Sequence, residues 1–142
     1  MGRYFYRVFD ETSVSRFSES EGFKAGRSTG TFKPHLPKAK KVVQQHKRWE
    51  NRKPSPFISV TRSRAKAVHY ARQRREWGRD DVQIAKIDRT SLRNAGVTIY
   101  HMATLVERIG AHIDSAAWNW TEYLCLYHIP SDAVVAVKKF EC

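Results

Sequence analysis

Three polar side chains interrupt segments that otherwise have the composition of buried strands. Arg7 lies in "RYFYRVFD" (3–10), Ser59 in "FISVT" (57–61) and Glu122 at the start of "EYLCLYHI" (122–129). Segments rich in aromatic and β-branched residues are typical of strands. An arginine can bind phosphate oxygens through two parallel hydrogen bonds, and a fixed carboxylate stabilises positive charge. The three residues are therefore candidates for chemistry if the fold brings them together.

Each of the three also has an ordinary structural explanation. Taken alone, Arg7 would be a residue of an edge strand, Ser59 a buried hydroxyl bonded to the backbone, and Glu122 a solvated residue at a strand start. Their order and flanking segments make them candidates as a set. No GxGxxG, GxxxxGK[ST] or GxSxG motif occurs, which argues against Rossmann, P-loop and hydrolase folds. The six histidines show no HExxH spacing, so we assign no metal.

Length and composition predict one globular domain over residues 1–142. The chain is 41% hydrophobic and 12% aromatic, enough to form a core. No run approaches the roughly 18–20 apolar residues of a membrane span, and the N-terminus lacks the apolar stretch of a signal peptide. We therefore expect an intracellular monomer, cytoplasmic or nuclear. The two cysteines, Cys125 and Cys142, form no CxxC pair, and Cys125 is expected to be a small buried hydrophobe.

The positive charge is concentrated in one third of the chain. Residues 33–79 hold 15 of the 26 Lys and Arg residues but only two of the 14 Asp and Glu residues, Glu50 and Glu76. This segment alone carries a net charge of +13, against +12 for the whole chain. It predicts an anionic partner: a nucleic acid, a nucleotide, an acidic protein surface or a membrane surface. A solvated helix surface that aids solubility would give the same pattern.

The remaining elements follow from hydrophobic periodicity and turn residues. The expected strands are 3–10, 57–60, 81–88, 97–102, 122–129 and 133–142. The expected helices are 38–52, 64–78 and 103–114, with a cap and short turn at 89–96. Thr61 or Ser63 would cap the helix at 64–78, in which a stripe is formed by Ala67, Val68, Ala71 and Trp77. This order of elements is typical of an α+β domain.

Taken in order, these segments resemble the ADP-ribosyltransferase superfamily. "YRVFD" before the glycine-bounded "GFKAG", "FISVT" before an alanine-rich helix, and "TEYLCLYHIP" before the last strand are similar to the branch with arginine, serine and glutamate as its signature. That branch includes cholera-like and pierisin-like toxins, and the sequence also resembles uncharacterised domains of filamentous fungi. The resemblance covers nearly the whole chain, and its motifs are specific only as an ordered set.

The resemblance implies a fold, a substrate and a role for each residue. The fold would be a split, bent antiparallel β-sheet core with flanking helices, and NAD⁺ would lie between the two small sheets. Arg7 would bind the phosphate or adenosine-side ribose. Ser59 would orient the catalytic Glu122, which would bond the 2′-hydroxyl of the nicotinamide-side ribose. Thr61 keeps a hydroxyl in the serine motif of the same site. Apart from the resemblance, Tyr70 would supply a ring for nicotinamide unless it packs in the core as an aromatic of the helix stripe. The implied function is an NAD-dependent mono-ADP-ribosyltransferase that releases nicotinamide.

Trp120 departs from the pattern of that branch. Many members carry Gln or Glu two residues before the catalytic glutamate, where it helps to place the acceptor, so arginine modification is less expected here. We expect a nucleic acid or an acidic protein as acceptor, bound through the basic face 33–79 and without membrane contact. Trp118, Asn119 and Trp120 would recognise it, unless the two tryptophans close the core. The alternative function is an inactive or weakly NAD-hydrolysing basic module that binds nucleic acid or an acidic partner.

Overall fold

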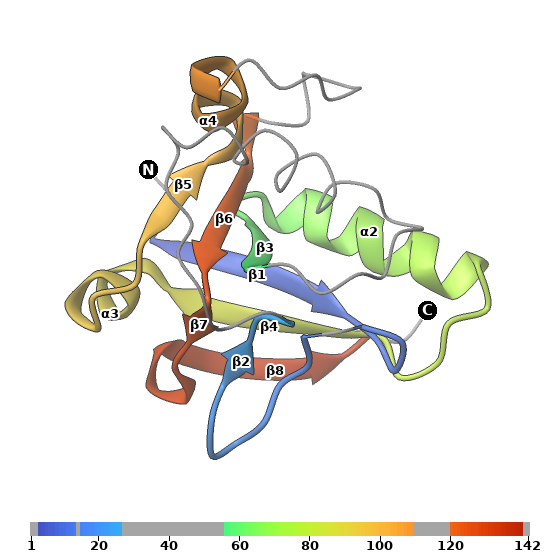
Figure 1. The fold of residues 1–142 in the computed structure, drawn as a ribbon. Helices are drawn as coiled ribbons and strands as arrows, with labels where there is room; N and C mark the ends of the chain where they lie inside the picture. Colours follow the sequence, from blue (N-terminus) through green and yellow to red (C-terminus); the bar gives the residue numbers. More distant parts are fainter. Residues whose placement is uncertain (1–2, 14, 27–55, 110–119, 141–142) are drawn as a thin grey trace.

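The computed structural model of the chain describes residues 3–13, 15–26, 56–109 and 120–140. Strands and short helices follow one another along these residues, and the strands pair antiparallel (Figure 1). The α+β class predicted from the sequence is confirmed. The helix expected at 38–52 lies outside the described residues.

Six strands form the larger sheet, in the order β5-β6-β3-β1-β4-β8. Their bounds are β1 Tyr4–Phe9, β3 Phe57–Thr61, β4 Gln83–Asp88, β5 Ile99–His101, β6 Glu122–Leu126 and β8 Val134–Lys139. β1 pairs with β4, and β3 with β6, along their whole lengths. Between β1 and β3, in contrast, one register pair is formed, Tyr6 with Thr61. In Figure 1, β5 and β6 run at a steep angle to β1, β4 and β8.

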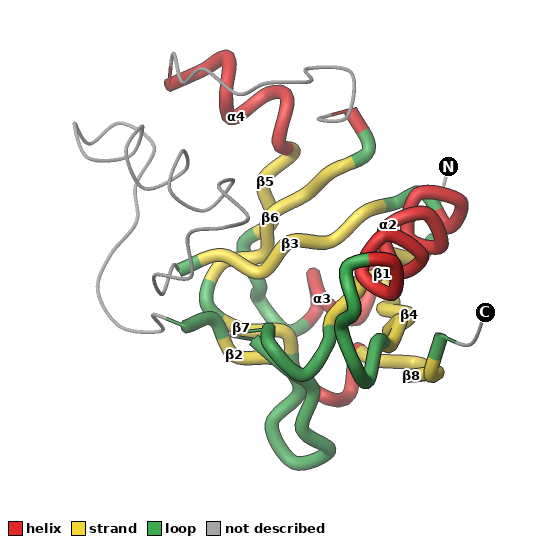
Figure 2. Tube along the Cα trace, turned by 90° about the vertical axis from the view of Figure 1, so that its right-hand side faces the viewer, coloured by secondary structure: helices red, strands yellow, loops and turns green. Residues whose placement is uncertain are grey.

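The main core lies between this sheet and a smaller one, formed by β2 (Phe23–Lys24) and β7 (His128–Ile129), which lie side by side in Figures 1 and 2. Its fully buried members include Phe5, Phe23, Ile58, Ala85, Ile87, Leu92, Cys125 and Ile129. The prediction that Cys125 is a buried hydrophobe is confirmed. Successive strand residues point to opposite faces, so Tyr6 and Val8 of β1 belong to a second cluster under α2.

Helix α2 (Arg64–Glu76) lies along β1 (Figure 2). Ser63 is its N-cap, because the Ser63 hydroxyl accepts a hydrogen bond from the backbone N–H of Lys66 at 3.1 Å. Ala67 and Ala71 of the predicted stripe are buried, but Trp77 is 52% exposed. Including Trp77 in the stripe was wrong because the helix ends before it, and Trp77 is the C-cap.

Two shorter helices complete the described part. α3 (Arg89–Asn94) is a helix rather than the short turn expected there, because the Asp88 carboxylate accepts from the backbone N–H of Thr90 and caps it. α4 (Met102–Ile109) begins where β5 ends. No helix in the described ranges is long and apolar enough to cross a membrane.

The predicted continuous strand over 122–129 was wrong. Tyr127 has φ 67°, in the left-handed region that a side chain rarely adopts, and this ends β6. The chain then enters β7, which pairs with β2 in the other sheet. The last strand starts at Val134 rather than residue 133, after a 3₁₀ turn over Ser131–Ala133. Gly22 makes this corner possible, since a Cβ there would clash with the carbonyl oxygen of Ile129.

Candidate functional site

Arg7, Ser59 and Glu122 lie on three adjacent strands, β1, β3 and β6. Arg7 is therefore not on an edge strand, since β1 is paired on both sides. Its guanidinium reaches across to β3, where Nη1 donates to the carbonyl oxygen of Ser59 at 2.9 Å. Nη2 donates to the carbonyl oxygen of Ser15 at 2.8 Å. Arg7 thus ties the loop after β1 to the middle of β3.

The Arg7 guanidinium is a buried cation that carries unused hydrogen-bonding capacity. Its Nε is buried and has no partner among the described residues, and within them no carboxylate forms an ion pair with it. Burial, together with the nearby charge of Arg74, lowers the pKa of Arg7 to about 9, so it remains charged at neutral pH. An uncompensated buried charge is costly. This position therefore favours an anion.

Glu122 is buried rather than solvated. Only 8% of its surface is exposed, which shows that the reading of a solvated strand start was wrong. It is in register with Thr61 of β3, so the two side chains share one face of the sheet. Tyr70 reaches the carboxylate from α2: burial, the Glu122 charge and a hydrogen bond to the Glu122 side chain raise the pKa of Tyr70. The Tyr70 hydroxyl is therefore a stable donor to this carboxylate.

Ser59 and Thr61 of β3 point to the same face of the sheet as Glu122 of β6, but they make different contacts. The main chain of Ser59 accepts the Arg7 hydrogen bond, and Ser59 is in register with Leu124. The hydroxyl of Thr61 donates to the carbonyl oxygen of Thr121 at 3.1 Å and accepts from the backbone N–H of Ser63 at 3.2 Å. Thr61, Tyr70 and Glu122 thus lie together on one face of the sheet, next to Ser59. Arg7 follows Tyr6, which pairs with Thr61, so its side chain points to the opposite face, where it lies over the ring of Phe23 in the main core. Arg7 meets this group of residues through the main-chain carbonyl of Ser59.

Two site residues were missed by the sequence analysis. The ammonium group of Lys66 in α2 donates to the hydroxyl of Thr121 at 2.7 Å, and that hydroxyl lies 3.4 Å from Oε2 of Glu122. Lys66 and Thr121 are 55 positions apart, so no local spacing points to the contact. A polar residue directly before a candidate catalytic glutamate was the one available signal.

Trp120 lies at the entry to β6, and 62% of its surface is exposed. It does not close the core. His101 of β5 holds it in place: Nε2 of His101 is 2.9 Å from the carbonyl oxygen of Trp120, and the two ring centroids are 5.7 Å apart. Because a carbonyl oxygen only accepts, Nε2 carries the proton. Trp118 and Asn119 lie outside the described residues.

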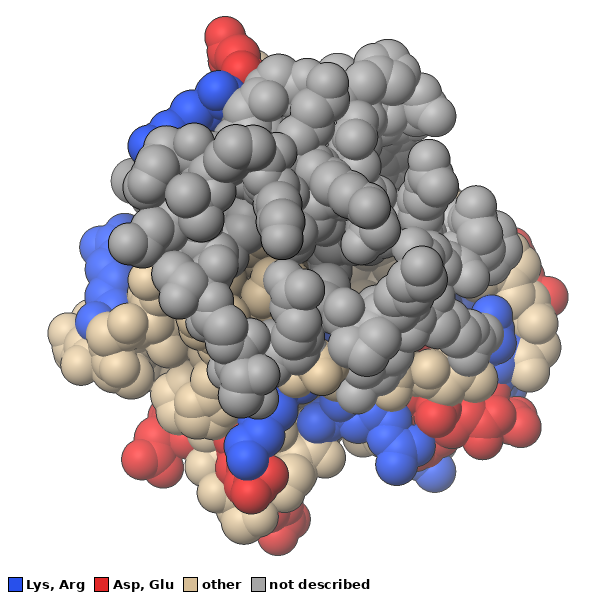
Figure 3. Space-filling model, in the orientation of Figure 1, with Lys and Arg blue, Asp and Glu red and all other residues tan. Residues whose placement is uncertain are grey.

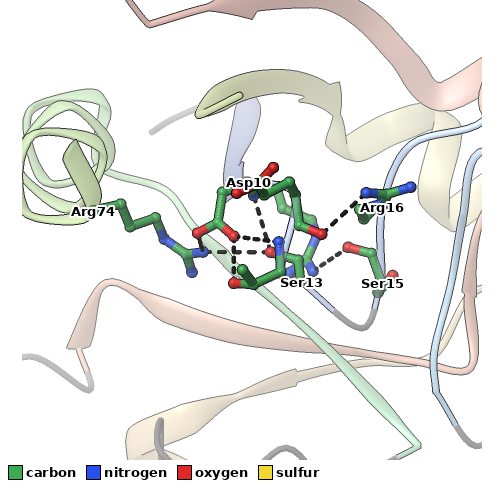
Figure 4. Close-up of polar contacts among 8 residues, drawn as sticks. Asp10, Ser13, Ser15, Arg16 and Arg74 are labelled. Atoms are coloured by element: carbon green, nitrogen blue, oxygen red, sulfur yellow. Dashed lines mark hydrogen bonds and ion pairs between the residues drawn. The ribbon is translucent and has the colours of Figure 1, made fainter. Parts of the chain in front are cut away.

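The loop after β1 is fastened to α2 behind Arg7. Asp10 is 2% exposed, and its Oδ2 accepts from Nη1 of Arg74 at 2.6 Å (Figure 4). Its Oδ1 accepts from the backbone N–H and the hydroxyl of Thr12. The same Arg74 nitrogen lies 3.3 Å from the hydroxyl of Ser13. The loop that supplies the Ser15 carbonyl to Arg7 is thereby fixed to α2 at its start.

Residues 33–55, about half of the predicted basic face 33–79, lie outside the described residues. From residue 56 onward, its exposed arginines are Arg62, Arg64, Arg72 and Arg75. On the face drawn in Figure 3, the described surface carries acidic side chains among the basic ones. In the described ranges, no three His, Cys, Asp or Glu side chains gather as a metal site requires.

Comparisons with known proteins agree with the observed architecture. A family model described as "Domain of unknown function (DUF7587)" matches residues 1–142. Among solved structures, EcPltA has a similar fold, with a TM-score of 0.58 at 16% sequence identity, over 96% of this chain and 74% of that one. At this identity the likeness concerns the fold alone. No curated protein matches the sequence.

Proposed function

The chain belongs to the DUF7587 family, and we propose that it is an NAD-dependent mono-ADP-ribosyltransferase. The observation that carries the proposal is the placement of Arg7, Ser59 and Glu122 on adjacent strands, with the Arg7 guanidinium bonded to the main-chain carbonyl oxygen of Ser59. The fold supports it, because EcPltA is a typhoid-toxin-like ADP-ribosyltransferase subunit. The larger sheet supports it too. Because β1 and β3 share one register pair, the sheet can be divided there into two parts, β5-β6-β3 and β1-β4-β8, and this division fits the split core that the sequence resemblance implies.

Arg7 is suited to bind the pyrophosphate of NAD⁺. It is a buried, charged guanidinium without an ion-pair partner in the described part of the chain, and an anion would compensate it. Its planar donors match phosphate oxygens. In the proposed complex, Ser59 is on β3, the strand between those of Arg7 and Glu122. The hydroxyl of Thr61 fixes the carbonyl of Thr121, the residue before Glu122.

Glu122 is suited to stabilise the transition state. The bond between C1′ of the ribose and N1 of nicotinamide breaks, its electron pair stays with nicotinamide, and the ring leaves neutral. Positive charge then develops on the ribose, as in glycoside hydrolysis. A fixed carboxylate favours that charge over bound NAD⁺. The acceptor's lone pair forms the new bond to C1′, and its proton passes to solvent.

The acceptor proposed for this reaction is a nucleic acid or an acidic protein. Trp120 stands where the resembled branch often has Gln or Glu, and its exposed ring beside His101 supports stacking on a planar acceptor. Stacking on an exposed aromatic ring contributes roughly 1–3 kcal/mol per base. When no acceptor is bound, water would take its place and the products would be ADP-ribose and nicotinamide.

Release of nicotinamide from NAD⁺ tests the proposed function directly. Purified protein is incubated with NAD⁺, with and without cell extract, and nicotinamide is measured. Because Glu122 supplies one preorganised electrostatic contact, we expect Glu122→Gln to lower the rate about 100- to 1,000-fold. Glu107→Gln, at an exposed glutamate of α4, is the matched control and should retain the wild-type rate. No release by the wild type under any condition would overturn the proposal.

The second candidate function is a non-catalytic module that binds an anionic partner. The exposed arginines of α2 favour it, and it predicts binding to single-stranded nucleic acid whose log K falls steeply with log[salt]. Arg72→Gln with Arg75→Gln should weaken that binding, while Glu122→Gln should leave it unchanged. Arg74 is unsuitable for this test, since it forms the ion pair with Asp10.

A further inference from the structure

The segment that leads into α2 holds the residue directly before Glu122. The carbonyl oxygen of Thr121 accepts from the Thr61 hydroxyl at 3.1 Å and from the backbone N–H of Arg62 at 2.9 Å. The side chain of Thr121 is bonded as well, to the ammonium group of Lys66 at 2.7 Å. Thr121 is therefore fixed through both its main chain and its side chain. Because Glu122 follows directly, the backbone of Glu122 is held in place as well.

The donor roles around the Thr121 hydroxyl follow from its partners. The Lys66 ammonium group only donates, so the hydroxyl oxygen accepts that bond. Its single hydrogen remains for Oε2 of Glu122, which is 3.4 Å away. A cation bonded to the hydroxyl oxygen polarises the O–H and strengthens it as a donor to a carboxylate. The chain Lys66–Thr121–Glu122 therefore has a defined direction, from cation to anion.

Lys66 is placed for this by the helix itself. Its backbone N–H is bonded to the capping Ser63 hydroxyl, which fixes where the helix begins. Tyr70 lies four positions further on, and side chains four apart on a helix are neighbours on one face. Tyr70 bonds Glu122 directly, and Lys66 acts on it through Thr121. The same face of α2 thus presents one donor to the carboxylate and one to the Thr121 hydroxyl beside it.

We propose that Lys66 is a positioning residue, which holds the Glu122 carboxylate in its working orientation through the Thr121 hydroxyl. The inference rests on the proposed function, because the orientation matters for the transition state of that reaction. Lys66 acts through another residue and is assigned no contact with NAD⁺. Its loss should therefore lower kcat and leave KM for NAD⁺ nearly unchanged.

The test is a double-mutant cycle between Lys66 and Thr121, with nicotinamide release and Tm measured for every variant. Lys66→Met removes the donor, and Thr121→Val removes the hydroxyl at nearly constant shape. We expect each to lower kcat about 10- to 100-fold, the size of effect that a small misplacement of a catalytic group has. The kcat of the double variant should be no lower than that of the slower single variant. Lys66→Arg keeps a cationic donor and should recover most of kcat.

Arg93→Met, at an exposed arginine of α3, is the control for loss of one positive charge and should match the wild type. Multiplicative losses of kcat in the double variant would overturn the inference, and so would a Lys66→Met enzyme with unchanged kcat. If the wild type released no nicotinamide, the proposed function would fail instead. The Tm values would then decide: non-additive losses support the Lys66–Thr121 link, and additive losses overturn it.

Discussion

Glu122 is a nearly buried carboxylate, and such a group is stable only where donors satisfy it. Tyr70 supplies one donor from α2. Because Tyr70→Phe removes that donor and keeps the ring, we expect the free energy of unfolding to fall by about 1–3 kcal/mol. Urea denaturation measures it. Tyr4→Phe is the control, since the ring of Tyr4 packs under Lys86 and that contact survives the change. An equal effect of the two changes would contradict the role given to Tyr70.

Cys125 is a fully buried thiol beside a buried cation. Burial raises the pKa of Cys125 to about 12, although the charge of Arg7 acts in the opposite direction. The thiolate is the reactive form, so the folded protein should protect this sulfur. In a Cys142→Ser background, we expect Cys125 to react with a disulfide reagent at least about 100-fold more slowly in the native state than in denaturant. Rapid reaction of the folded protein would show that the strand opens readily at β6.

The end of β1 and helix α2 are joined by the ion pair of Asp10 and Arg74. Asp10→Asn removes the charge on the more buried side and leaves Arg74 without its counter-ion. Because Arg74 is partly exposed, we expect a loss of about 1–3 kcal/mol in the free energy of unfolding, less than for a fully buried pair. Glu21→Gln, which removes the exposed pair with Lys24, should change it by less than about 0.5 kcal/mol. Denaturation of the three proteins at pH 7 measures both.

The same ion pair predicts a pH dependence in the acid range. Burial alone would raise the pKa of Asp10, but hydrogen bonds from Thr12 and Arg74 outweigh it, and the pKa is lowered. A carboxylate with a lowered pKa in the folded state stabilises the protein above its unfolded pKa near 4. That contribution is lost as the pH falls through the folded-state value. The stability difference between wild type and Asp10→Asn should therefore shrink below about pH 4. A difference that stays constant down to pH 2 would contradict this.

Among the elements, the sequence predicted best those that a single local pattern determines, such as strand-like composition or a helix cap. β1, β3 and α2 lie where composition and capping placed them. The break at Tyr127 was not predictable, because its positive φ comes from the pairing of β7 with β2 and not from a turn residue. The expected strand at 133–142 was too early because Pro130 begins a 3₁₀ turn that takes up its first residue.

The residues of the candidate site likewise fall into those that the sequence could predict and those that it could not. Arg7, Ser59 and Glu122 stood out because polar residues in apolar strands are conspicuous in a sequence. Lys66, Asp10 and Arg74 did not, because their partners are more than 50 positions away and their own segments are ordinary for a surface helix or a strand end. Such pairs depend on how α2 crosses the sheet, and that geometry is absent from any local pattern.

Over the whole molecule, α2 connects the two parts of the larger sheet. Ala67 and Ala71 pack in a cluster with Val8 of β1, and Arg74 bonds Asp10 at the end of that strand. Lys66 and Tyr70 contact Thr121 and Glu122 of the other part. Since β1 and β3 share a single register pair, this helix adds a second link between the parts. A ligand bound by Arg7 and Glu122 would add a third.

That third link can be measured as stabilisation by NAD⁺. Anything that binds only the folded state stabilises it, by about 2.7 kcal/mol at a hundredfold excess over Kd, or roughly 10 °C in Tm for a chain of this size. Glu122→Gln is the suitable protein, because it should bind NAD⁺ without consuming it. In that background, Arg7→Lys should lose most of the shift, since an ammonium group lacks the planar pair of donors, whereas Arg3→Lys, at an exposed residue, should keep it. An equal shift in both would mean that NAD⁺ binds away from Arg7, and the proposed arrangement of substrate across the two parts of the sheet would then be wrong.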